Sequence, residues 1–293
     1  MKKKAYIQLV LAMIIWGTLG PLVKQIPLAS GEIVLARVIL GFVTLAVIYF
    51  VSGEYRTGGI TDRAAARRDI AILFISGAVM GFNWVFLFEA YKYTTVSMAT
   101  VSYYCAPVII TVLSPLVLGE KLTAARIAGI AAATAGMFMI TGSLSGGSQP
   151  LKGILFGLLA ALFYACVTIL NKKLKGSFTG IQITMIQLLA AGLVVTPYAV
   201  AKHQGAWVMP HGAGLVCLVI IGVLHTGIVL YFYFSSMQVL PGQSVAMCSY
   251  IDPVSSLMIA AIALGERMSV IQIIGAFLII GGAAFGELYR KKE

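Results

Sequence analysis

Residues 103–121 read YYCAPVIITVLSPLVLGEK, and residues 249–267 read SYIDPVSSLMIAAIALGER. Both stretches have a tyrosine, a proline within an apolar run and a Leu-Gly-Glu-basic turn at matching positions, 146 residues apart. Further along, Gly129 and Gly136 align with Gly275 and Gly282. Generic hydrophobicity would align valines and isoleucines, but not a proline, a charged turn and two glycines together. The sequence therefore predicts an internal duplication, with repeats at residues 1–146 and 147–293.

The composition predicts a protein that is embedded in a membrane. Of its 293 residues 60% are hydrophobic and only 11% are charged, and the mean hydropathy is +0.96. A soluble domain of this size would need far more charge to cover its surface. Apolar runs of about 20 residues, the length that crosses a bilayer core, recur throughout. We predict ten transmembrane helices, at residues 5–26, 32–52, 70–91, 95–117, 123–142, 152–172, 180–200, 213–236, 243–264 and 269–287.

The basic residues predict the orientation of these helices. The net charge is +11, but the Lys and Arg residues lie between apolar runs, which indicates membrane topology and not nucleic-acid binding. With the N-terminus in the cytoplasm, 15 of the 21 basic residues fall on the cytoplasmic side and 5 on the other. This bias predicts a multi-pass plasma (inner) membrane protein with both termini cytoplasmic. Each half then has an odd number of helices, so the two repeats are expected to be inverted.

Two prolines lie at matching places inside predicted helices. Pro107 and Pro253 each lack an N–H group and clash with the carbonyl group four residues earlier. The freed carbonyl groups of Tyr103 and Ser249 need protein or water around them at that depth. Interrupted helices at equivalent positions in two halves are typical of a transporter's substrate site. A simple packing kink is the alternative.

Two ionisable residues are expected near the bilayer centre, namely Asp252 and His225. Such groups are costly in a membrane and are candidates for substrate or ion coupling. A protonated His225 could pair with Asp252, or either group could carry a coupling proton. Alternatively, each could bond only to neighbouring helices. The equivalent positions of the first repeat hold Val79 and Ala106, so one asymmetric site is expected.

A basic and an acidic residue lie nearer to the ends of their predicted helices. Arg37 is about five residues into the second helix, and Glu89 is near the end of the third. Arg37 could bind a substrate carboxylate with its planar fork. Snorkelling to the interface or pairing with Glu89 is the favoured interpretation. Glu89 is expected at the interface, where a gate residue would also lie.

Aromatic and polar side chains gather near the centres of the predicted helices, away from the interfaces where Trp and Tyr usually anchor. A cavity lined by them would be apolar with a few polar groups, as small-molecule pockets are. It could hold an amino acid with an apolar side chain, or an organic cation by cation–π contact. Some of them are expected to fill the core instead. The predicted lining residues are Trp16, Asn83, Tyr103, Tyr104, Tyr164, Ser249 and Tyr250.

Motifs for enzymatic chemistry are missing from the sequence. It has no Walker loop, no HExxH and no GxSxG, and its four cysteines form no CxxC pair. We therefore predict neither a metal nor a cofactor, and no enzymatic activity.

The stretch from Ala90-Tyr91-Lys92-Tyr93-Thr94 through Pro107 to Leu118-Gly119-Glu120-Lys121, repeated around Pro253, resembles the EamA-like family of the drug/metabolite transporter superfamily. Trp16-Gly17 and Tyr164 resemble the family as well. The resemblance covers essentially the whole chain. It implies ten helices in two inverted five-helix repeats around a central cavity. It also implies transport of amino acids, related metabolites or drugs, most often outward, by a bacterial membrane protein.

Three functions are compared on this basis. The first is a secondary exporter of amino acids or related metabolites. The second is proton-coupled uptake or exchange of a polar or cationic solute or drug. The third, a membrane-embedded enzyme or scaffold, has no need of inverted halves. The expected partners are a small-molecule substrate and the lipid bilayer, with protons as a candidate coupling ion. Gly-xxx-Gly spacings at residues 77–81, 153–157 and 282–286 would permit a homodimer.

Overall fold

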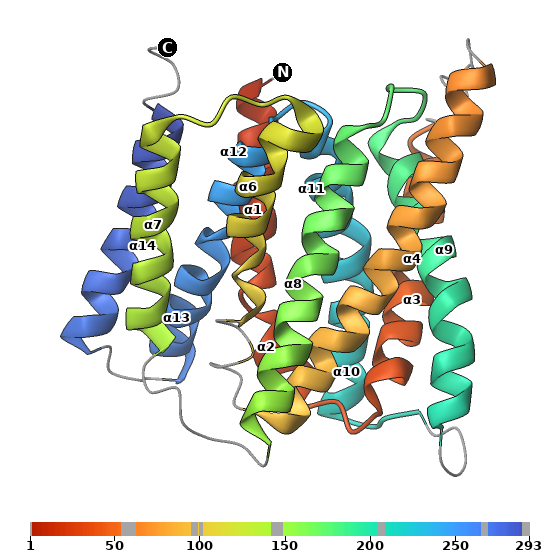
Figure 1. Ribbon diagram of the computed structural model, residues 1–293. Coiled ribbons are helices and arrows are strands. Elements are labelled where there is room, and N and C mark those ends of the chain that lie inside the picture. Colours follow the sequence, from red (N-terminus) through yellow and green to blue (C-terminus); the bar gives the residue numbers. More distant parts are fainter. Residues whose placement is uncertain are drawn as a thin grey trace.

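The computed structural model describes residues 2–53, 63–94, 99, 102–141, 149–203, 209–264 and 269–288. In these ranges the chain forms helices and no strand. The helices lie side by side in one bundle, and α1 begins at the same end of the bundle at which α14 finishes (Figure 1). The first part of the chain forms α1 (Lys2–Trp16), α2 (Leu19–Lys24), α3 (Ser30–Val51), α4 (Arg63–Tyr93), α6 (Ala106–Leu118) and α7 (Ala124–Thr141). The second part forms α8 (Pro150–Lys172), α9 (Gly180–Lys202), α10 (Ala213–Ile220), the π-helix η2 (Ile221–Ile228), α11 (Val229–Met237), α12 (Gly242–Ser249), α13 (Ile251–Leu264) and α14 (Val270–Leu288).

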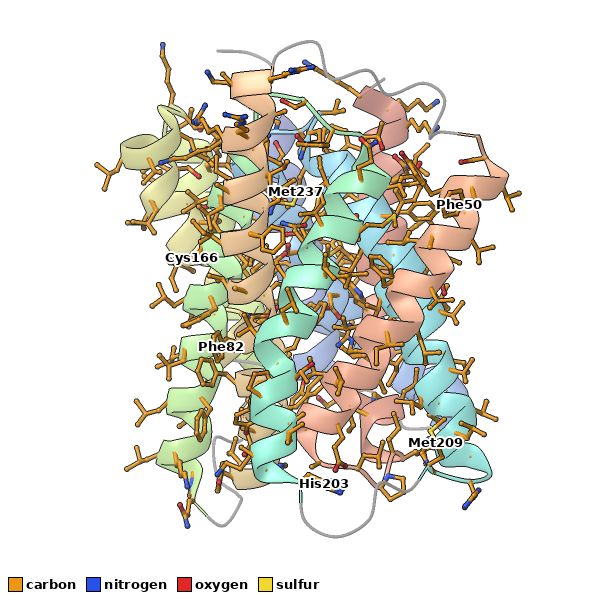
Figure 2. The ribbon with its side chains drawn as sticks, turned by 90° about the vertical axis from the view of Figure 1, so that its right-hand side faces the viewer. Phe50, Phe82, Cys166, His203, Met209 and Met237 are labelled. Atoms are coloured by element: carbon orange, nitrogen blue, oxygen red, sulfur yellow. The ribbon has the colours of Figure 1, made fainter. Side chains whose placement is uncertain are left out.

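Five helical stretches of the described chain are long and apolar enough to cross a membrane. They are Ser30–Val51, Arg63–Tyr93, Pro150–Lys172, Gly180–Lys202 and Ala213–Met237. Large apolar side chains cover the outside of the bundle, where lipid would solvate them; Phe50, for example, is 65% exposed and lies at the outer surface of α3 (Figure 2). The prediction of an all-helical membrane protein is confirmed at this level.

Several predicted helices are interrupted in the structure. The first breaks at Gly17 and Thr18, between α1 and α2. The eighth contains the π-helical segment η2, and the ninth breaks at Tyr250, between α12 and α13. In the fourth, Tyr104 and Cys105 form a turn directly before α6. These interruptions lie within long apolar runs. Hydropathy detects the runs but not the breaks in them.

One boundary differs clearly from the prediction, because α4 begins at Arg63 and not at residue 70. The added segment RAAARRD consists mainly of good helix formers. Its last residue, Asp69, is fully buried and accepts hydrogen bonds from the backbone N–H groups of Lys175 and Ser177 at 3.1–3.2 Å. Helix α4 therefore extends beyond its apolar part, and through Asp69 it holds the loop that contains Lys175 and Ser177 in the second half. The predicted turn at Gly265, Glu266 and Arg267 lies outside the described residues.

Helices α7 and α14 lie against one another, antiparallel, at one side of the bundle (Figure 1). A Cβ atom on Gly129 would lie 2.5 Å from the carbonyl oxygen of Gly282, and one on Gly136 would lie 2.5 Å from that of Gly275. In the sequence repeat Gly129 corresponds to Gly275 and Gly136 to Gly282. Exchanging the two halves therefore turns the contact between Gly129 and Gly282 into the contact between Gly275 and Gly136.

The Gly-xxx-Gly spacings are used within the chain. The first pair faces α9, the second faces residues on either side of the undescribed segment before α6, and the third faces α7 and α12. The first pair lies close to Gln187 and Val195. The second lies close to Thr94 and Ser102, and the third to Gly129 and Met247. Because these faces are already covered, the spacing is no argument for a homodimer.

Two charged side chains connect helices at the end of the bundle near the chain termini. The Glu120 carboxylate accepts hydrogen bonds from the backbone N–H groups of Gly242 and Gln243, at 2.8 and 3.2 Å, and so caps the start of α12. The Lys172 ammonium group donates to the carbonyl oxygens of Met237 and Leu240, at 2.7 and 2.6 Å, after α11. Both charges match the sign that a helix end favours. Glu120 is thus a structural residue that caps a helix of the other half.

Candidate functional site

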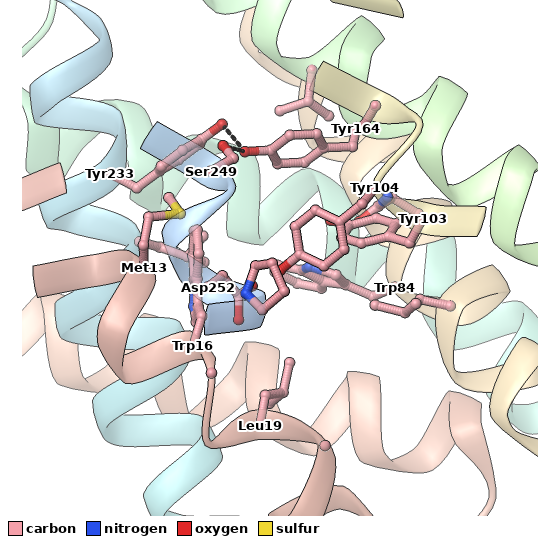
Figure 3. A pocket seen from close by; sticks show the side chains of 18 of the residues that line it. Met13, Trp16, Leu19, Trp84, Tyr103, Tyr104, Tyr164, Tyr233, Ser249 and Asp252 are labelled. Atoms are coloured by element: carbon pink, nitrogen blue, oxygen red, sulfur yellow. Dashed lines mark hydrogen bonds between the residues drawn. The ribbon is translucent and has the colours of Figure 1, made fainter. Parts of the chain in front are cut away.

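A cavity of about 130 Å³ lies inside the bundle (Figure 3). Its walls come from α1, α2, α3, α4, α6, α8, α11, α12 and α13. On α4 it contacts Met80 to Tyr91, in the half of that helix remote from the chain termini. On α8 and α11 it contacts Tyr164 and Tyr233, in the parts of those helices nearer to the termini, so the cavity extends through the middle of the bundle.

Most residues proposed from the sequence do line this cavity. It brings together side chains from the first and second halves of the chain, including both prolines, which follow the interruptions before α6 and between α12 and α13. Three proposed residues, Glu89, His225 and Tyr250, are not among its lining residues. Those that line it are Trp16, Arg37, Asn83, Tyr103, Tyr104, Pro107, Tyr164, Ser249, Asp252 and Pro253.

Three hydroxyl groups meet at one wall of the cavity (Figure 3). Tyr233 donates a hydrogen bond of 2.6 Å to the hydroxyl oxygen of Tyr164, and Tyr164 is 3.1 Å from the Ser249 hydroxyl. Thr168 lies behind them, 3.3 Å from the Tyr233 hydroxyl group. The ring of Trp16 is 5.1 Å from that of Tyr233. These contacts connect α1, α8, α11 and α12 and give the wall a fixed shape.

The Asp252 carboxyl group faces the cavity from the first turn of α13. Its hydrogen-bonding neighbour is the hydroxyl group of Tyr104, and the two side chains are drawn together in Figure 3. The Tyr104 ring contacts that of Tyr103, with centroids 5.8 Å apart. Opposite, the Asn83 amide donates to the carbonyl oxygen of Ala160 at 2.6 Å. The cavity therefore has polar groups at fixed positions between aromatic rings.

Arg37 differs from both favoured expectations. It is 1% exposed, so it does not snorkel to an interface. Its Nε donates to the hydroxyl oxygen of Thr226 at 2.8 Å, and its guanidinium carbon lies 4.3 Å from the centroid of the Trp84 ring. Within the described residues Nη1 has no hydrogen-bond partner. No carboxylate of the described chain lies within ion-pair distance of this group.

Glu89, the expected partner of Arg37, is engaged elsewhere. Its carboxylate is 2.7 Å from the Lys92 ammonium group and accepts a hydrogen bond of 3.4 Å from Tyr198. Glu89 and Lys92 lie near the end of α4, on either side of the lining residue Tyr91, but neither of them lines the cavity. The prediction of an interfacial position agrees with this place, whereas the pairing with Arg37 is wrong.

His225 lies behind the cavity, in the π-helical segment. Its Nε2 is 2.8 Å from the Thr18 hydroxyl, and its Nδ1 is 3.3 Å from the carbonyl oxygen of Ile220. Its own carbonyl oxygen accepts a hydrogen bond of 3.1 Å from the Trp16 indole. Both ring nitrogens of His225 therefore face groups other than Asp252, and the expected pair does not form. Single turns of π-helix often occur at functional sites.

Tyr250 packs in the core. It is fully buried, its hydroxyl group is 3.0 Å from that of Thr134, and its ring stacks on Tyr104 at 6.3 Å. It therefore supports a lining residue without facing the cavity. The structure also adds Trp84 and Tyr233, which the sequence analysis did not select. Trp84 is an aromatic residue well inside α4, so the signal used for the others would have found it, whereas Tyr233 lies close to the end of its stretch at Met237, where that signal does not apply.

The cavity can surround a small solute with aromatic rings and offer it a guanidinium group, a carboxyl group and several hydroxyl groups. Such a mixture suits binding of a molecule that is partly apolar and partly charged. In the described part of the chain no three His, Cys, Asp or Glu side chains gather as metal ligands would.

Comparison with known proteins gives the family. The model of the EamA-like transporter family matches residues 3–142 and 151–286. The transporter YxxF of Bacillus subtilis is 29% identical over 97% of this chain and 89% of its own length. A probable amino-acid metabolite efflux pump of Escherichia coli is 25% identical, covering 99% of this chain and 98% of the pump. A probable terminal-alkyne amino-acid exporter of Streptantibioticus cattleyicolor is 25% identical over 95% of this chain and 92% of its own length.

A crystal structure in the same fold overlays 99% of this chain with a TM-score of 0.78, at 19% identity. The fold, the helices long enough to cross a membrane and the doubled family match agree with one another. The chain is a member of the EamA-like transporter family, as its proline and Leu-Gly-Glu repeats predicted.

Proposed function

We propose that this transporter exports amino acids or related small metabolites across the plasma membrane by alternating access. The observation that supports it most is the cavity, which lies where helices of both halves are interrupted and carries charged and aromatic groups together. Two relatives of matching length have names that describe amino-acid or amino-acid metabolite efflux. As a secondary transporter it would use an ion gradient or the gradient of its substrate.

The proposed architecture consists of ten transmembrane helices, in two inverted repeats at residues 1–146 and 147–293 around this cavity. The exchange-symmetric contacts between Gly129 and Gly282 and between Gly136 and Gly275 support a two-fold relation between the halves. The distribution of basic residues supports cytoplasmic termini.

In this arrangement the end of the bundle near the termini would be closed to the cytoplasm. There Glu120 of the first half caps α12 of the second, and Lys172 connects α8 to the end of α11. Loading from the cytoplasm would then require the contact between Glu120 and α12 to open while the opposite end closes. Such rocking of one half against the other is the usual way in which inverted repeats expose a central site alternately.

Flux into proteoliposomes tests the proposed function. The purified full chain should move radiolabelled amino acids faster than empty vesicles do, and Ser249→Trp should abolish this flux because the indole would fill the cavity. Leu151→Trp is the matched control, since Leu151 is 78% exposed on the outside of α8. Absence of flux for every amino acid tested, together with flux of an organic cation, would refute the proposal.

Growth of an overexpressing strain on toxic amino-acid analogues tests the direction of transport. Export predicts resistance relative to a strain that carries the Ser249→Trp variant. Increased sensitivity would instead indicate uptake, and the direction proposed here would be wrong.

Proton-coupled transport is the second candidate, because the Asp252 carboxyl group lines the cavity. If it carries the coupling proton, a pH gradient should accelerate flux through the wild type, and Asp252→Asn should remove this acceleration while leaving substrate exchange. Asp69→Asn is a matched control, because Asp69 is equally an acid inside the protein but caps a loop outside the cavity. A pH response that survives in Asp252→Asn would rule out this role.

A further inference from the structure

A positively charged group without an ionic partner lies in the wall of the cavity. Arg37 is 1% exposed and lines the cavity, and in the described part of the chain its buried Nη1 has no hydrogen-bond partner. Removal of one partner from a buried charge is strongly unfavourable, so a buried guanidinium group normally satisfies its donors. An unsatisfied donor on a side chain that lines a cavity indicates that a ligand in the cavity supplies the missing acceptor.

The rest of Arg37 is held in place, so the guanidinium group keeps a defined orientation. Nε is bonded to Thr226 at 2.8 Å, and the guanidinium group lies over Trp84, with Phe88 at 5.7 Å. Thr226 is itself fixed, because its hydroxyl group donates to the carbonyl oxygen of Ile221 at 2.8 Å within the π-helical segment. A planar fork held in this way matches a carboxylate group.

An acidic group faces the same cavity. Asp252 reaches it from α13, while Arg37 reaches it from α3. The two do not form an ion pair in the described chain. Tyr103, which also lines the cavity, is an electrostatic neighbour of both. The site therefore keeps a cationic and an anionic group apart, with space between them.

Aromatic and aliphatic side chains form the remaining surface around these two charges. Trp16 and Tyr233 border the cavity from α1 and α11, and Leu87 and Val167 from α4 and α8. A ligand that satisfies both charges must carry a carboxylate and an ammonium group and have an apolar remainder. An α-amino acid with an apolar side chain meets these requirements.

We propose that Arg37 and Asp252 together recognise a zwitterionic amino acid with an apolar side chain, Arg37 binding its carboxylate and Asp252 its ammonium group. This inference rests on the proposed function and specifies its substrate class. A ligand with only one of the two charges leaves the opposite protein charge unpaired, so it binds more weakly. A site that binds a polar group of its ligand discriminates strongly against an analogue without that group. An apolar site discriminates far less between ligands that differ by one methylene group.

Calorimetric titration of the purified full chain tests the proposal. The probes are L-leucine and L-phenylalanine, each with two analogues: the amine without its carboxylate (3-methylbutylamine, 2-phenylethylamine) and the acid without its ammonium group (4-methylpentanoate, 3-phenylpropionate). One charge-assisted contact corresponds to about 10- to 150-fold in affinity, so each analogue should bind the wild type more weakly by this factor.

Two variants should then separate the charges. Arg37→Gln should weaken binding of the amino acids about 10- to 150-fold and leave binding of the amines unchanged. Asp252→Asn should weaken binding of the amino acids and leave binding of the acids unchanged. Arg37→Lys keeps the charge without the fork and should lie between wild type and Arg37→Gln.

Arg126→Gln and Asp69→Asn are the matched controls, because Arg126 is 4% exposed, Asp69 is fully buried and neither lines the cavity. Both should bind L-leucine like the wild type. If Arg37→Gln lowers the affinities for amines and amino acids equally, or lowers neither, the assignment of Arg37 is overturned. Failure of the wild type to bind either amino acid overturns this inference alone when another metabolite is still transported. If the wild type in proteoliposomes transports neither amino acids nor any other metabolite, the proposed function is overturned together with this inference.

Discussion

Individual side chains set the shape of the cavity wall through hydrogen bonds that cross between helices. Tyr233 and Thr168 are both buried, and their hydroxyl groups meet the half-buried Tyr164 and, through it, Ser249. Every buried hydroxyl group needs a partner, because an unsatisfied one costs about 1–3 kcal/mol. The chain of hydroxyl groups therefore fixes both the wall and the relative positions of α8, α11 and α12.

Tyr233→Phe removes the donor of the 2.6 Å bond to Tyr164. We expect a loss of about 1 kcal/mol in the free energy of unfolding, since Tyr164 keeps Ser249 as a partner. Thermal unfolding in detergent measures the loss. In the double variant Tyr233→Phe/Tyr164→Phe the effects should be less than additive. Strict additivity would show that the bond contributes nothing.

Whole helices depend on small residues where they cross. Helix α4 lies against α9 at Gly77, where a Cβ atom would be 2.7 Å from the Cα atom of Gln187 and 2.8 Å from the Cβ atom of Ala190. Backbone cannot yield as a flexible side chain can. The pocket-lining part of α4 is therefore positioned by a contact that lies outside the cavity, nearer to the start of the helix.

Gly77→Ala should separate α4 from α9 and destabilise the protein by about 1–3 kcal/mol, as overpacking does. Gly281→Ala is the matched control, because no atom of the described chain lies within 4 Å of the place that its new methyl group would take on α14. There alanine should be neutral or stabilise the helix by up to about 1 kcal/mol. Melting temperatures of the two variants in detergent compare them, and equal effects would contradict the close crossing.

At the scale of the molecule, the number of times that the chain crosses the bundle decides at which end each loop and each terminus lies. Helix α8 begins at Pro150, at the end opposite the termini, and finishes at Lys172, at the same end as the termini (Figure 1). Gln149 and Lys175 are exposed near its two ends. They therefore report on opposite sides of the membrane.

With cytoplasmic termini, a cysteine placed at Gln149 should react with a membrane-impermeant maleimide in intact cells. One placed at Lys175 should react only after the membrane is opened. The four native cysteines, Cys105, Cys166, Cys217 and Cys248, would first be replaced by alanine. Gel-shift labelling measures the reaction. The reverse pattern would show that the proposed orientation is wrong, whereas labelling of both sites from outside would contradict the helix arrangement.

The sequence by itself determined the helical membrane character, the family and most of the polar residues that line the cavity. These features depend on local properties: the length of apolar runs, the lack of an N–H group at Pro107 and Pro253, and the cost of polar groups deep in a membrane. For the same reason Asp252 could be proposed without knowledge of its neighbours, and it does line the cavity.

Only the tertiary structure decided which groups meet. Arg37 faces Thr226 and Trp84 and not Glu89, and His225 bonds to Thr18 and not to Asp252. The partner of a charged side chain depends on how helices from distant parts of the chain are packed and rotated, and hydropathy does not encode this rotation. The π-helical segment has the same origin, since its carbonyl groups are stabilised by contacts from other helices, such as the bond from Trp16. The sequence supplied the charges, and the packing placed them on one cavity.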